Sequence, residues 1–174
     1  GEHTFAEYTF SLLLALTRKI SESIKVVKES ICLLPHTIRG VDLCGKTLGV
    51  VGTGKIGKRV IAIARGFGMN VIAYDMYEDK EQAHLLGFMY VTLEDLLKKS
   101  DVISLHTPLT SDNTHMLSDN AFSLMKDGVY IINTARGELI DTKALIAALD
   151  TGKVSGVGLD VVEGEELLKE KCMI

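Results

Sequence analysis

Residues 47–57 read Thr-Leu-Gly-Val-Val-Gly-Thr-Gly-Lys-Ile-Gly, and this stretch decides the predicted fold. It opens with a short apolar run without alternation, which is expected of a strand buried on both faces. From Lys55 to Phe67 the apolar residues take helical spacing instead. Between strand and helix lies the pattern Gly-x-Gly-x-x-Gly, which in this context is the fingerprint of a dinucleotide-binding turn.

The three glycines of this turn have separate physical roles. Gly52 allows the tight turn, Gly54 allows the backbone to approach a pyrophosphate, and Gly57 allows the helix to pack on the strand. The helix supplies backbone N–H groups and the positive end of its dipole to the phosphates. The alternative is a plain strand–helix turn with incidental glycines, and the surrounding pattern favours the dinucleotide site.

An acidic residue accompanies the turn. Asp75 ends the next predicted strand, residues 70–75, at about the 20-residue spacing expected of a carboxylate that bonds the adenosine ribose. This carboxylate would repel a 2′-phosphate, so NAD is favoured over NADP, although the nearby Lys80 could weaken the preference. The alternative is a solvated aspartate at a strand end.

Outward from this unit, apolar runs alternate with helical patterns. Strands are predicted over residues 47–52, 70–75, 88–91, 101–106, 129–133 and 154–161. Helices are predicted over residues 55–67, 80–86, 92–99, 118–125 and 141–149, the last three capped by Thr92, Ser118 and Asp141. Such alternation indicates βαβ units. We therefore expect an α/β fold, a doubly wound parallel sheet of order 3-2-1-4-5-6, with ligands at the carboxyl ends of its strands.

The first 30 residues are predicted to form one long helix. Their apolar residues recur at spacings of three and four, the period of a single apolar stripe. The stripe consists of Phe5, Tyr8, Leu12, Leu16, Ile20, Ile24 and Val27. Because the apolar face widens around residues 12–14, we expect this helix to be well buried.

Composition excludes several classes of protein. The chain has 174 residues, 47 % hydrophobic and 24 % charged, with a formal net charge of −4, which fits one folded domain. The absence of a basic cluster disfavours nucleic-acid binding, and no apolar run reaches the ~20 residues that span a bilayer. Cys32, Cys44 and Cys172 fit neither a disulfide framework nor a zinc site. With no metal-ligand spacing among the histidines, we expect no metal and a reducing, cytoplasmic location.

Two further polar residues lie at the ends of predicted strands. His106, followed by Thr107 and Pro108, could be an acid–base catalyst or a hydrogen-bonding residue beside the cofactor, and we favour the second role. Arg136 lies in a glycine-bounded loop, where its planar fork could clamp a carboxylate. The alternative for Arg136 is a surface ion pair with Glu138, Asp141 or Glu163.

An acidic cluster follows the last predicted strand. Asp160 ends that strand, and Glu163, Glu165 and Glu166 come shortly after it. Such carboxylates could orient a histidine and raise its pKa. For Glu163 and Glu166 we favour the alternative, a solvated charged tail.

Four segments, taken in order, carry a resemblance to a known family. They are residues 48–57 with 74–75, residues 104–108, residues 125–137 and residues 158–165. They are similar to the signatures of the D-isomer-specific 2-hydroxyacid dehydrogenases, and the chain resembles the Rossmann-fold nucleotide-binding domain of that family. The helix over residues 6–18 resembles the family's long interdomain helix. The tail from Glu165 onward is similar to the D-lactate dehydrogenase branch.

The resemblance implies roles for individual residues. Arg136 would bind the substrate and polarise its carbonyl, and Glu165 would pair with a catalytic histidine. Asp75 would hold the adenosine ribose. The other implied cofactor contacts are Gly52, Gly54, Lys55, Ile56 and Gly57 at the pyrophosphate, His106, Thr107 and Pro108 after the fourth strand, and Thr134, Ala135, Arg136 and Asp160 beside the nicotinamide.

The resemblance also implies a domain organisation. Residues 1–174 would form an isolated NAD-binding domain, with an interdomain helix over 1–30 and a Rossmann core over 47–162. The family's substrate domain and catalytic histidine lie outside this chain, so we expect a fragment that binds NAD but turns over little D-lactate or other 2-hydroxy acid. We also expect a homodimer formed through the N-terminal helix. The alternative function is an NAD(H)-sensing interaction module, because one branch of the family acts as a corepressor.

Overall fold

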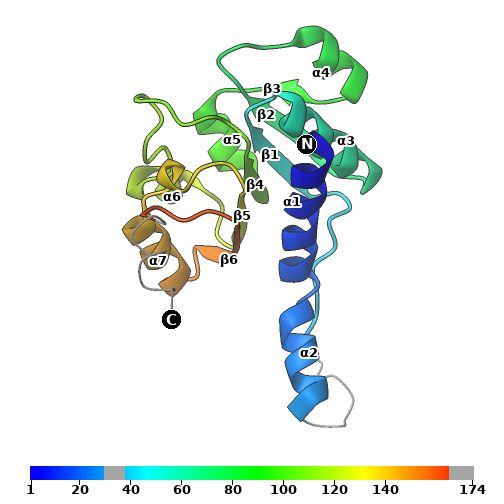
Figure 1. Cartoon of the computed structure of the whole chain (residues 1–174), viewed down its shortest axis with the longest axis vertical. Helices are drawn as coiled ribbons and strands as arrows, with labels where there is room; N and C mark the ends of the chain where they lie inside the picture. Colours follow the sequence, from blue (N-terminus) through cyan, green and yellow to red (C-terminus); the bar gives the residue numbers. More distant parts are fainter. Residues whose placement is uncertain (30–37, 165–174) are drawn as a thin grey trace.

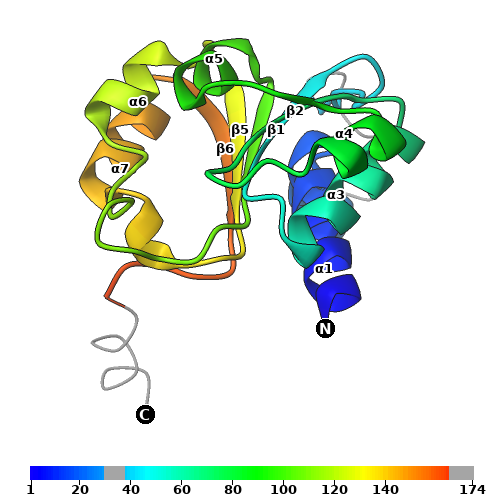
Figure 2. The same cartoon turned by 90° about the horizontal axis from the view of Figure 1, so that it is seen from above.

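The computed structural model describes residues 1–29 and 38–164. Within them, six parallel strands form one sheet with helices on both faces (Figures 1 and 2). The strands are β1 (Thr47–Val51), β2 (Asn70–Tyr74), β3 (Met89–Tyr90), β4 (Val102–Leu105), β5 (Val129–Asn133) and β6 (Val154–Leu159). Their order in the sheet is β3-β2-β1-β4-β5-β6, which confirms the predicted doubly wound topology.

The helices cover the two faces of the sheet in separate groups (Figure 2). One face carries α1 (Glu2–Thr17), α3 (Lys55–Gly66) and α4 (Lys80–Leu86), and the other carries α5 (Leu93–Lys99), α6 (Asp119–Leu124) and α7 (Thr142–Asp150). A short 3₁₀ helix, η1 (Gly137–Leu139), follows β5. Each face has its own buried apolar cluster. Cover on both sides explains why β1 and β4 are apolar without alternation.

The predicted single helix over residues 1–30 is instead two helices, α1 and α2 (Ile20–Glu29). Lys19, between them, has a left-handed backbone conformation with φ of 52°. The carbonyl of Thr17 accepts a hydrogen bond from the backbone N–H of Val41 at 2.7 Å, so a later part of the chain replaces the next helical turn. The apolar spacing runs unbroken through this point, so periodicity alone does not reveal the break.

The predicted stripe of the N-terminal helix is also largely wrong as a buried face. Its members that are 40–58 % exposed are Phe5, Tyr8, Ile20, Ile24 and Val27. The buried residues of α1 are Ala6, Thr9, Phe10, Leu13 and Thr17. The middle of α1 is apolar around much of its circumference, so two stripes satisfy the same period. All ten residues of α2 lie outside the core, and this helix extends away from the rest of the domain (Figure 1).

Two of the three predicted helix caps are confirmed. The side chains of Thr92 and Asp141 accept hydrogen bonds from backbone N–H groups in the first turns of α5 and α7. Ser118 precedes α6, but its side chain makes no capping hydrogen bond, so that prediction is wrong. The neighbouring Leu117 is instead held in a backbone bridge with Ile140, which fixes the start of α6 without a side-chain cap.

Candidate functional site

The polar candidates lie at one edge of the sheet. Five strands end directly before a candidate residue, and in chain order these residues are Gly52, Asp75, His106, Thr134 and Asp160. Because the strands are parallel and adjacent, their carboxyl ends place these residues along the same edge. Open α/β sheets bind their ligands at this edge.

The glycine turn after β1 forms a cradle in which the protein backbone can contact a ligand directly. Gly52 has φ of +94°, and a Cβ there would lie 2.5 Å from the carbonyl oxygen of His106. A Cβ on Gly57 would lie 2.0 Å from the carbonyl oxygen of Gly52, so only a glycine lets α3 pack this closely. A Cβ on Gly54 would meet no protein atom within 4 Å, which leaves space beside the backbone.

The helix that follows this turn presents an uncapped N-terminus. α3 begins at Lys55, with Gly54 as its N-cap, and no side chain caps its first turn. Lys55 is exposed, and Ile56 is half-buried against the core. Uncapped N–H groups and the positive end of the helix dipole suit an anion, so the residues present fit the diphosphate of a dinucleotide.

Asp75 lies beside the glycine turn and is held there by three hydrogen bonds. Its Oδ2 accepts from the backbone N–H of Thr53 at 2.7 Å and from the hydroxyl of Thr53 at 3.1 Å. Its Oδ1 accepts from the backbone N–H of Tyr77 at 2.9 Å. The end of β2 and the turn after β1 are thus bonded directly to each other, and the carboxylate has a fixed orientation.

His106 directly follows β4 and is half-buried beside the glycine turn. Its Nε2 lies 2.7 Å from the hydroxyl of Ser104, and its backbone N–H donates to the carbonyl of Val51 at 2.7 Å. Burial lowers the pKa of His106 to about 4. An imidazole with this pKa is neutral near pH 7, so it has no imidazolium proton to supply as a general acid there. The next residues, Thr107 and Pro108, continue along the carboxyl edge into an exposed loop.

Arg136 lies in a loop after β5 whose backbone is held by a buried asparagine. Asn133 donates from its side-chain amide to the carbonyl of Arg136 at 2.9 Å and accepts from the backbone N–H of Ala135 at 3.0 Å. The Arg136 side chain is exposed and donates to the carbonyl of Ala135 at 2.7 Å. Within residues 1–29 and 38–164 it forms no ion pair, so the alternative pairing with Glu138, Asp141 or Glu163 is absent there.

The segment after β6 lies against this loop. Asp160 donates its backbone N–H to the carbonyl of Asn133 at 3.0 Å. A Cβ on Gly137 would lie 2.3 Å from the backbone carbon of Val162, so the two backbones are in close contact. The structure therefore brings Asp160 next to the Arg136 loop, whereas Glu165 lies outside the described residues.

Glu163 corrects one expectation. It is not part of a solvated tail, because its Oε1 lies 2.6 Å from Nε2 of His115. Its Oε2 accepts from the hydroxyl of Thr142 at 3.5 Å. The hydrogen bond with Glu163 raises the pKa of His115. The partner comes from the loop after β4, so nothing local to Glu163 in the sequence indicates this contact.

Comparison with known proteins identifies the family. The family described as D-isomer specific 2-hydroxyacid dehydrogenase, NAD binding domain, matches residues 10–173. The chain belongs to this family. Its cofactor is accordingly NAD, in agreement with the cradle and with the prediction from the glycine turn.

Individual relatives of this NAD-binding domain differ in the substrates that their names give. A 2-hydroxyacid dehydrogenase homolog of Haemophilus influenzae is 46 % identical over 160 residues, covering 92 % of this chain and 48 % of its own. The aromatic 2-oxoacid reductase of Clostridium sporogenes is 45 % identical, covering 94 % and 49 %. The crystal structure of D-lactate dehydrogenase from Aquifex aeolicus, complexed with NAD and lactic acid, has a TM-score of 0.93 and 44 % identity, covering 98 % of this chain and 51 % of that one. The chain spans about half the length of the relatives it matches.

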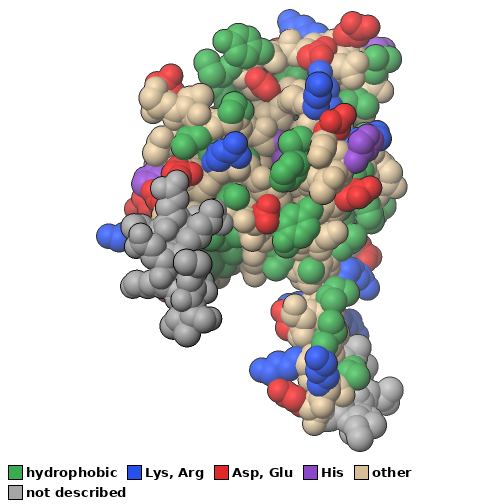
Figure 3. All heavy atoms as spheres, viewed as in Figure 1, with side chains coloured by type: hydrophobic (Ala, Val, Ile, Leu, Met, Phe, Trp, Pro, Cys, Tyr) green, Lys and Arg blue, Asp and Glu red, His purple; other side chains and the backbone are tan. Residues whose placement is uncertain are grey.

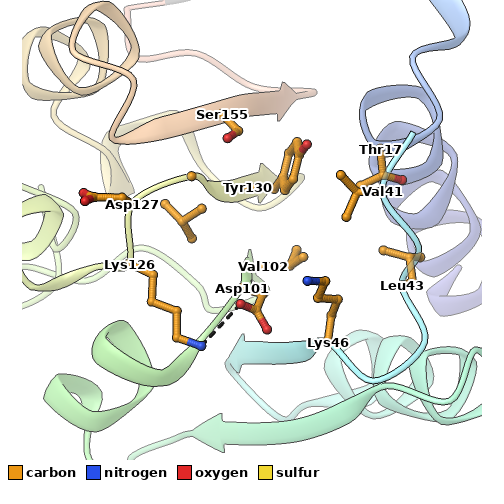
Figure 4. Close-up of a pocket in the computed structure, with 12 residues that line it drawn as sticks. Thr17, Val41, Leu43, Lys46, Asp101, Val102, Lys126, Asp127, Tyr130 and Ser155 are labelled. Atoms are coloured by element: carbon orange, nitrogen blue, oxygen red, sulfur yellow. Dashed lines mark hydrogen bonds and ion pairs between the residues drawn. The ribbon is translucent and has the colours of Figure 1, made fainter. Parts of the chain in front are cut away.

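A cavity of about 240 Å³ lies at the opposite edge of the sheet from the glycine turn (Figure 4). It is lined by residues that precede or begin β4, β5 and β6, by Thr17 at the end of α1, and by Val41, Leu43 and Lys46 before β1. Its carboxylates have partners, because Asp101 pairs with Lys126 at 3.3 Å and Asp127 pairs with Lys153 at 3.1 Å. Because it lies at the opposite edge, the cavity is separate from the edge at which the glycine turn and Asp75 lie.

The described part of the chain has neither a candidate metal-ligand cluster nor a candidate membrane-spanning helix. No group of three or more histidine, cysteine, aspartate or glutamate side chains there could hold a metal ion. No helix there is both long enough and apolar enough to cross a membrane.

Sequence reasoning missed three residues at the carboxyl edge: Thr53, Tyr90 and His115. Thr53 occupies a variable position of the glycine motif, where a hydroxyl is a visible but unspecific signal. The hydroxyl of Tyr90 lies 2.7 Å from that of Thr53, although β3 is predicted as an ordinary short strand. His115 has φ of 53°, and its location in a long loop conceals its pairing with Glu163.

Proposed function

We propose that the chain is the coenzyme domain of an NAD-dependent dehydrogenase that transfers hydride between NAD(H) and a D-2-hydroxy acid/2-oxo acid pair, with D-lactate and pyruvate as the preferred pair. The observation that carries the proposal is the glycine cradle with Asp75 hydrogen-bonded beside it. Membership of the family and the likeness to a D-lactate dehydrogenase support it. The free, exposed Cys44 suits a reducing cytoplasm, which is the location we propose.

In this proposal some residues at the carboxyl edge of the sheet bind the cofactor and others bind the substrate. Gly52, Gly54, Lys55, Ile56 and Gly57 hold the diphosphate, and Asp75 holds the adenosine ribose. The residues proposed to lie beside the rest of the cofactor are His106, Thr107, Pro108, Thr134, Ala135 and Asp160. When bound, NAD supplies the acceptor or donor of the hydride.

Arg136 is proposed to handle the substrate. Its backbone is held by the Asn133 contact, its guanidinium is exposed, and a guanidinium can hold a carboxylate through two parallel hydrogen bonds. Holding the substrate carboxylate would orient the adjacent carbonyl and polarise it for reduction. We propose that Glu165 pairs with a histidine carried by a segment beyond the matched half, and that this histidine exchanges the proton. The NAD-binding domain, residues 1–174, would then bind NAD alone and turn over little substrate without that segment.

Titration of the chain with NADH and NADPH tests the proposal. Because the fixed Asp75 carboxylate repels a 2′-phosphate, we expect NADH to bind at least about ten times more tightly, a difference of about 1.4 kcal/mol. The control is Asp75→Asn, which keeps the shape of the side chain but removes its charge, and which should abolish most of the difference. No binding of NADH by the unaltered chain would overturn the proposal.

A further inference from the structure

A series of hydrogen bonds through two hydroxyl groups leads to the Asp75 carboxylate. The hydroxyl of Thr53 lies 3.1 Å from Asp75 Oδ2 and 2.7 Å from the hydroxyl of Tyr90. The backbone N–H of Asp79 donates to the Tyr90 hydroxyl at 3.0 Å. Four groups from the glycine turn, the end of β2, β3 and the N-cap of α4 are thus joined in one series.

The direction of every proton in this series is determined by chemistry. An ionised carboxylate only accepts, so Thr53 must donate its single hydroxyl proton to Asp75. Thr53 can then only accept from Tyr90, which donates to it. The Tyr90 hydroxyl in turn accepts from the backbone N–H of Asp79, because a backbone N–H can only donate. Hydrogen bonds aligned in this way polarise and strengthen one another, so the Tyr90 hydroxyl strengthens the bond from Thr53 to Asp75 Oδ2.

The position of Tyr90 is set by more than its hydroxyl. Its ring packs edge-on against buried Phe88, with centroids 5.0 Å apart. Asp79 is fixed as well, because it caps α4 by accepting from Gln82 N and forms an ion pair with Lys58 of α3. Both ends of the hydroxyl series are therefore anchored in the fold.

We infer that Thr53 and Tyr90 are positioning residues that hold the Asp75 carboxylate toward the adenosine ribose and thereby set the preference for NAD over NADP. The inference rests on the proposed role of Asp75. Oδ2 is occupied by both Thr53 donors, and Oδ1 accepts from Tyr77 N with acceptor capacity remaining for a ribose hydroxyl. A carboxylate held in this way cannot turn aside to admit a 2′-phosphate, whereas one released from Thr53 could.

Matched variants separate the hydroxyls from the packing around them. Tyr90→Phe keeps the ring against Phe88 and removes the hydroxyl. Thr53→Val keeps the shape and the backbone N–H bond to Asp75, and Thr53→Ser keeps the hydroxyl. Each variant of the 174-residue chain is titrated with NADH and with NADPH, and its thermal unfolding is followed in parallel.

We expect Tyr90→Phe and Thr53→Val to weaken NADH binding by about fivefold, the effect of losing one hydrogen bond to the network. NADPH affinity should not fall, and it should rise to the extent that the released carboxylate turns aside, so the preference for NADH falls by about fivefold or more. Thr53→Ser, which keeps the hydroxyl, should keep the preference for NADH. A merely structural role would lower the melting temperature and weaken both dinucleotides in proportion.

The outcomes distinguish this inference from the proposed function. If the unaltered chain binds NADH with the expected preference and both hydroxyl-deleting variants keep that preference, the inference is overturned and the proposed function stands. If the unaltered chain does not bind NADH, the proposed function is overturned, and the inference with it. If Asp75→Asn keeps the preference, the carboxylate does not set it, and the inference is again overturned.

Discussion

Gly54 and Gly57 are three residues apart, but the structure makes opposite demands on them. A Cβ on Gly57 would lie 2.0 Å from the Gly52 carbonyl oxygen, so Gly57→Ala must displace backbone and should cost about 1–3 kcal/mol of stability. A Cβ on Gly54 meets nothing within 4 Å, so Gly54→Ala should leave the free energy of unfolding nearly unchanged. If the diphosphate lies against Gly54, the same change should weaken NADH binding by about tenfold or more.

Chemical denaturation and NADH titration of the two glycine variants check this prediction. Each variant is the control for the other, because both add one methyl group to the same turn. Undiminished NADH binding by Gly54→Ala would show that the dinucleotide does not approach the backbone there.

Arg136 is the residue at which substrate and cofactor roles can be separated. In the full-length enzyme, Arg136→Ala should lower kcat/KM for a 2-oxo acid by about a hundredfold or more, because it removes a charged, bidentate contact. The affinity for NADH should stay within about twofold. Steady-state kinetics with NADH titration measures both quantities, and Arg136→Lys, which keeps the charge without the planar fork, should recover only part of the loss. A large loss of NADH affinity would assign Arg136 to the cofactor instead.

At the residue scale, the sequence is enough to locate a residue whose place depends on the strand directly before it. The turn glycines, Asp75 and the glycine-bounded loop of Arg136 could be located at the carboxyl edge because each follows directly from a predicted strand. Tyr90 and the His115–Glu163 pair could not be predicted, because their partners are distant in the sequence and their residue types occur in many environments.

At the scale of elements, the His115–Glu163 pair joins the loop after β4 to the segment after β6. Its hydrogen bond raises the pKa of His115, with Asp141 acting in the same direction. A raised pKa of a histidine in the folded state means that the pair stabilises the protein fully below the unfolded pKa of about 6.5, and that this contribution is lost as pH rises through the raised value. The stabilisation by the His115–Glu163 pair should therefore weaken as pH rises above the raised pKa of His115.

Thermal unfolding of His115→Asn checks this pH dependence, since asparagine tolerates the positive φ at this position. The melting temperature of the variant should fall below that of the unaltered chain by more at about pH 6 than at about pH 9. Glu163→Gln should show the same pattern. A difference independent of pH would mean that the two side chains are not paired in solution.

The predicted strands and helices agree with the structure where the sequence has one apolar pattern and clear ends. All six strands lie within their predicted ranges, and the caps at Thr92 and Asp141 are present. The N-terminal helix was misread because its break at Lys19 is produced by a tertiary contact, the bond from Val41 to Thr17. Periodicity cannot contain that information, since it describes only neighbours along the chain.

At the scale of the whole molecule, α1 and α2 carry an apolar surface that is exposed in the described part of the chain. Hydrophobic side chains are visible along both helices in the space-filling view (Figure 3). The surface includes Phe5, Tyr8, Ile20, Ile24 and Val27, all 40 % exposed or more. We propose that a second copy of the chain covers it in a homodimer with an isologous interface.

Sedimentation equilibrium tests the dimer. The unaltered chain should sediment as a dimer at micromolar concentration, and Ile24→Glu should shift it to monomer by burying a charge at the interface. Glu22→Lys, on the same helix, changes charge without touching an apolar residue and should have a much smaller effect. A monomer at every concentration of the unaltered chain would contradict the proposal.

The contact between the first helix and the last strands has a consequence for biosynthesis. Leu12 of α1 packs on Gly158 of β6, and the hydroxyls of Thr9 and Thr134 lie 3.3 Å apart. On the ribosome, α1 therefore emerges long before the surface that shelters it has been translated. α3 can already cover part of α1 by then, but the apolar face of α1 that packs on β6 stays in solvent until β6 leaves the exit tunnel, and during this interval a chaperone could shield it.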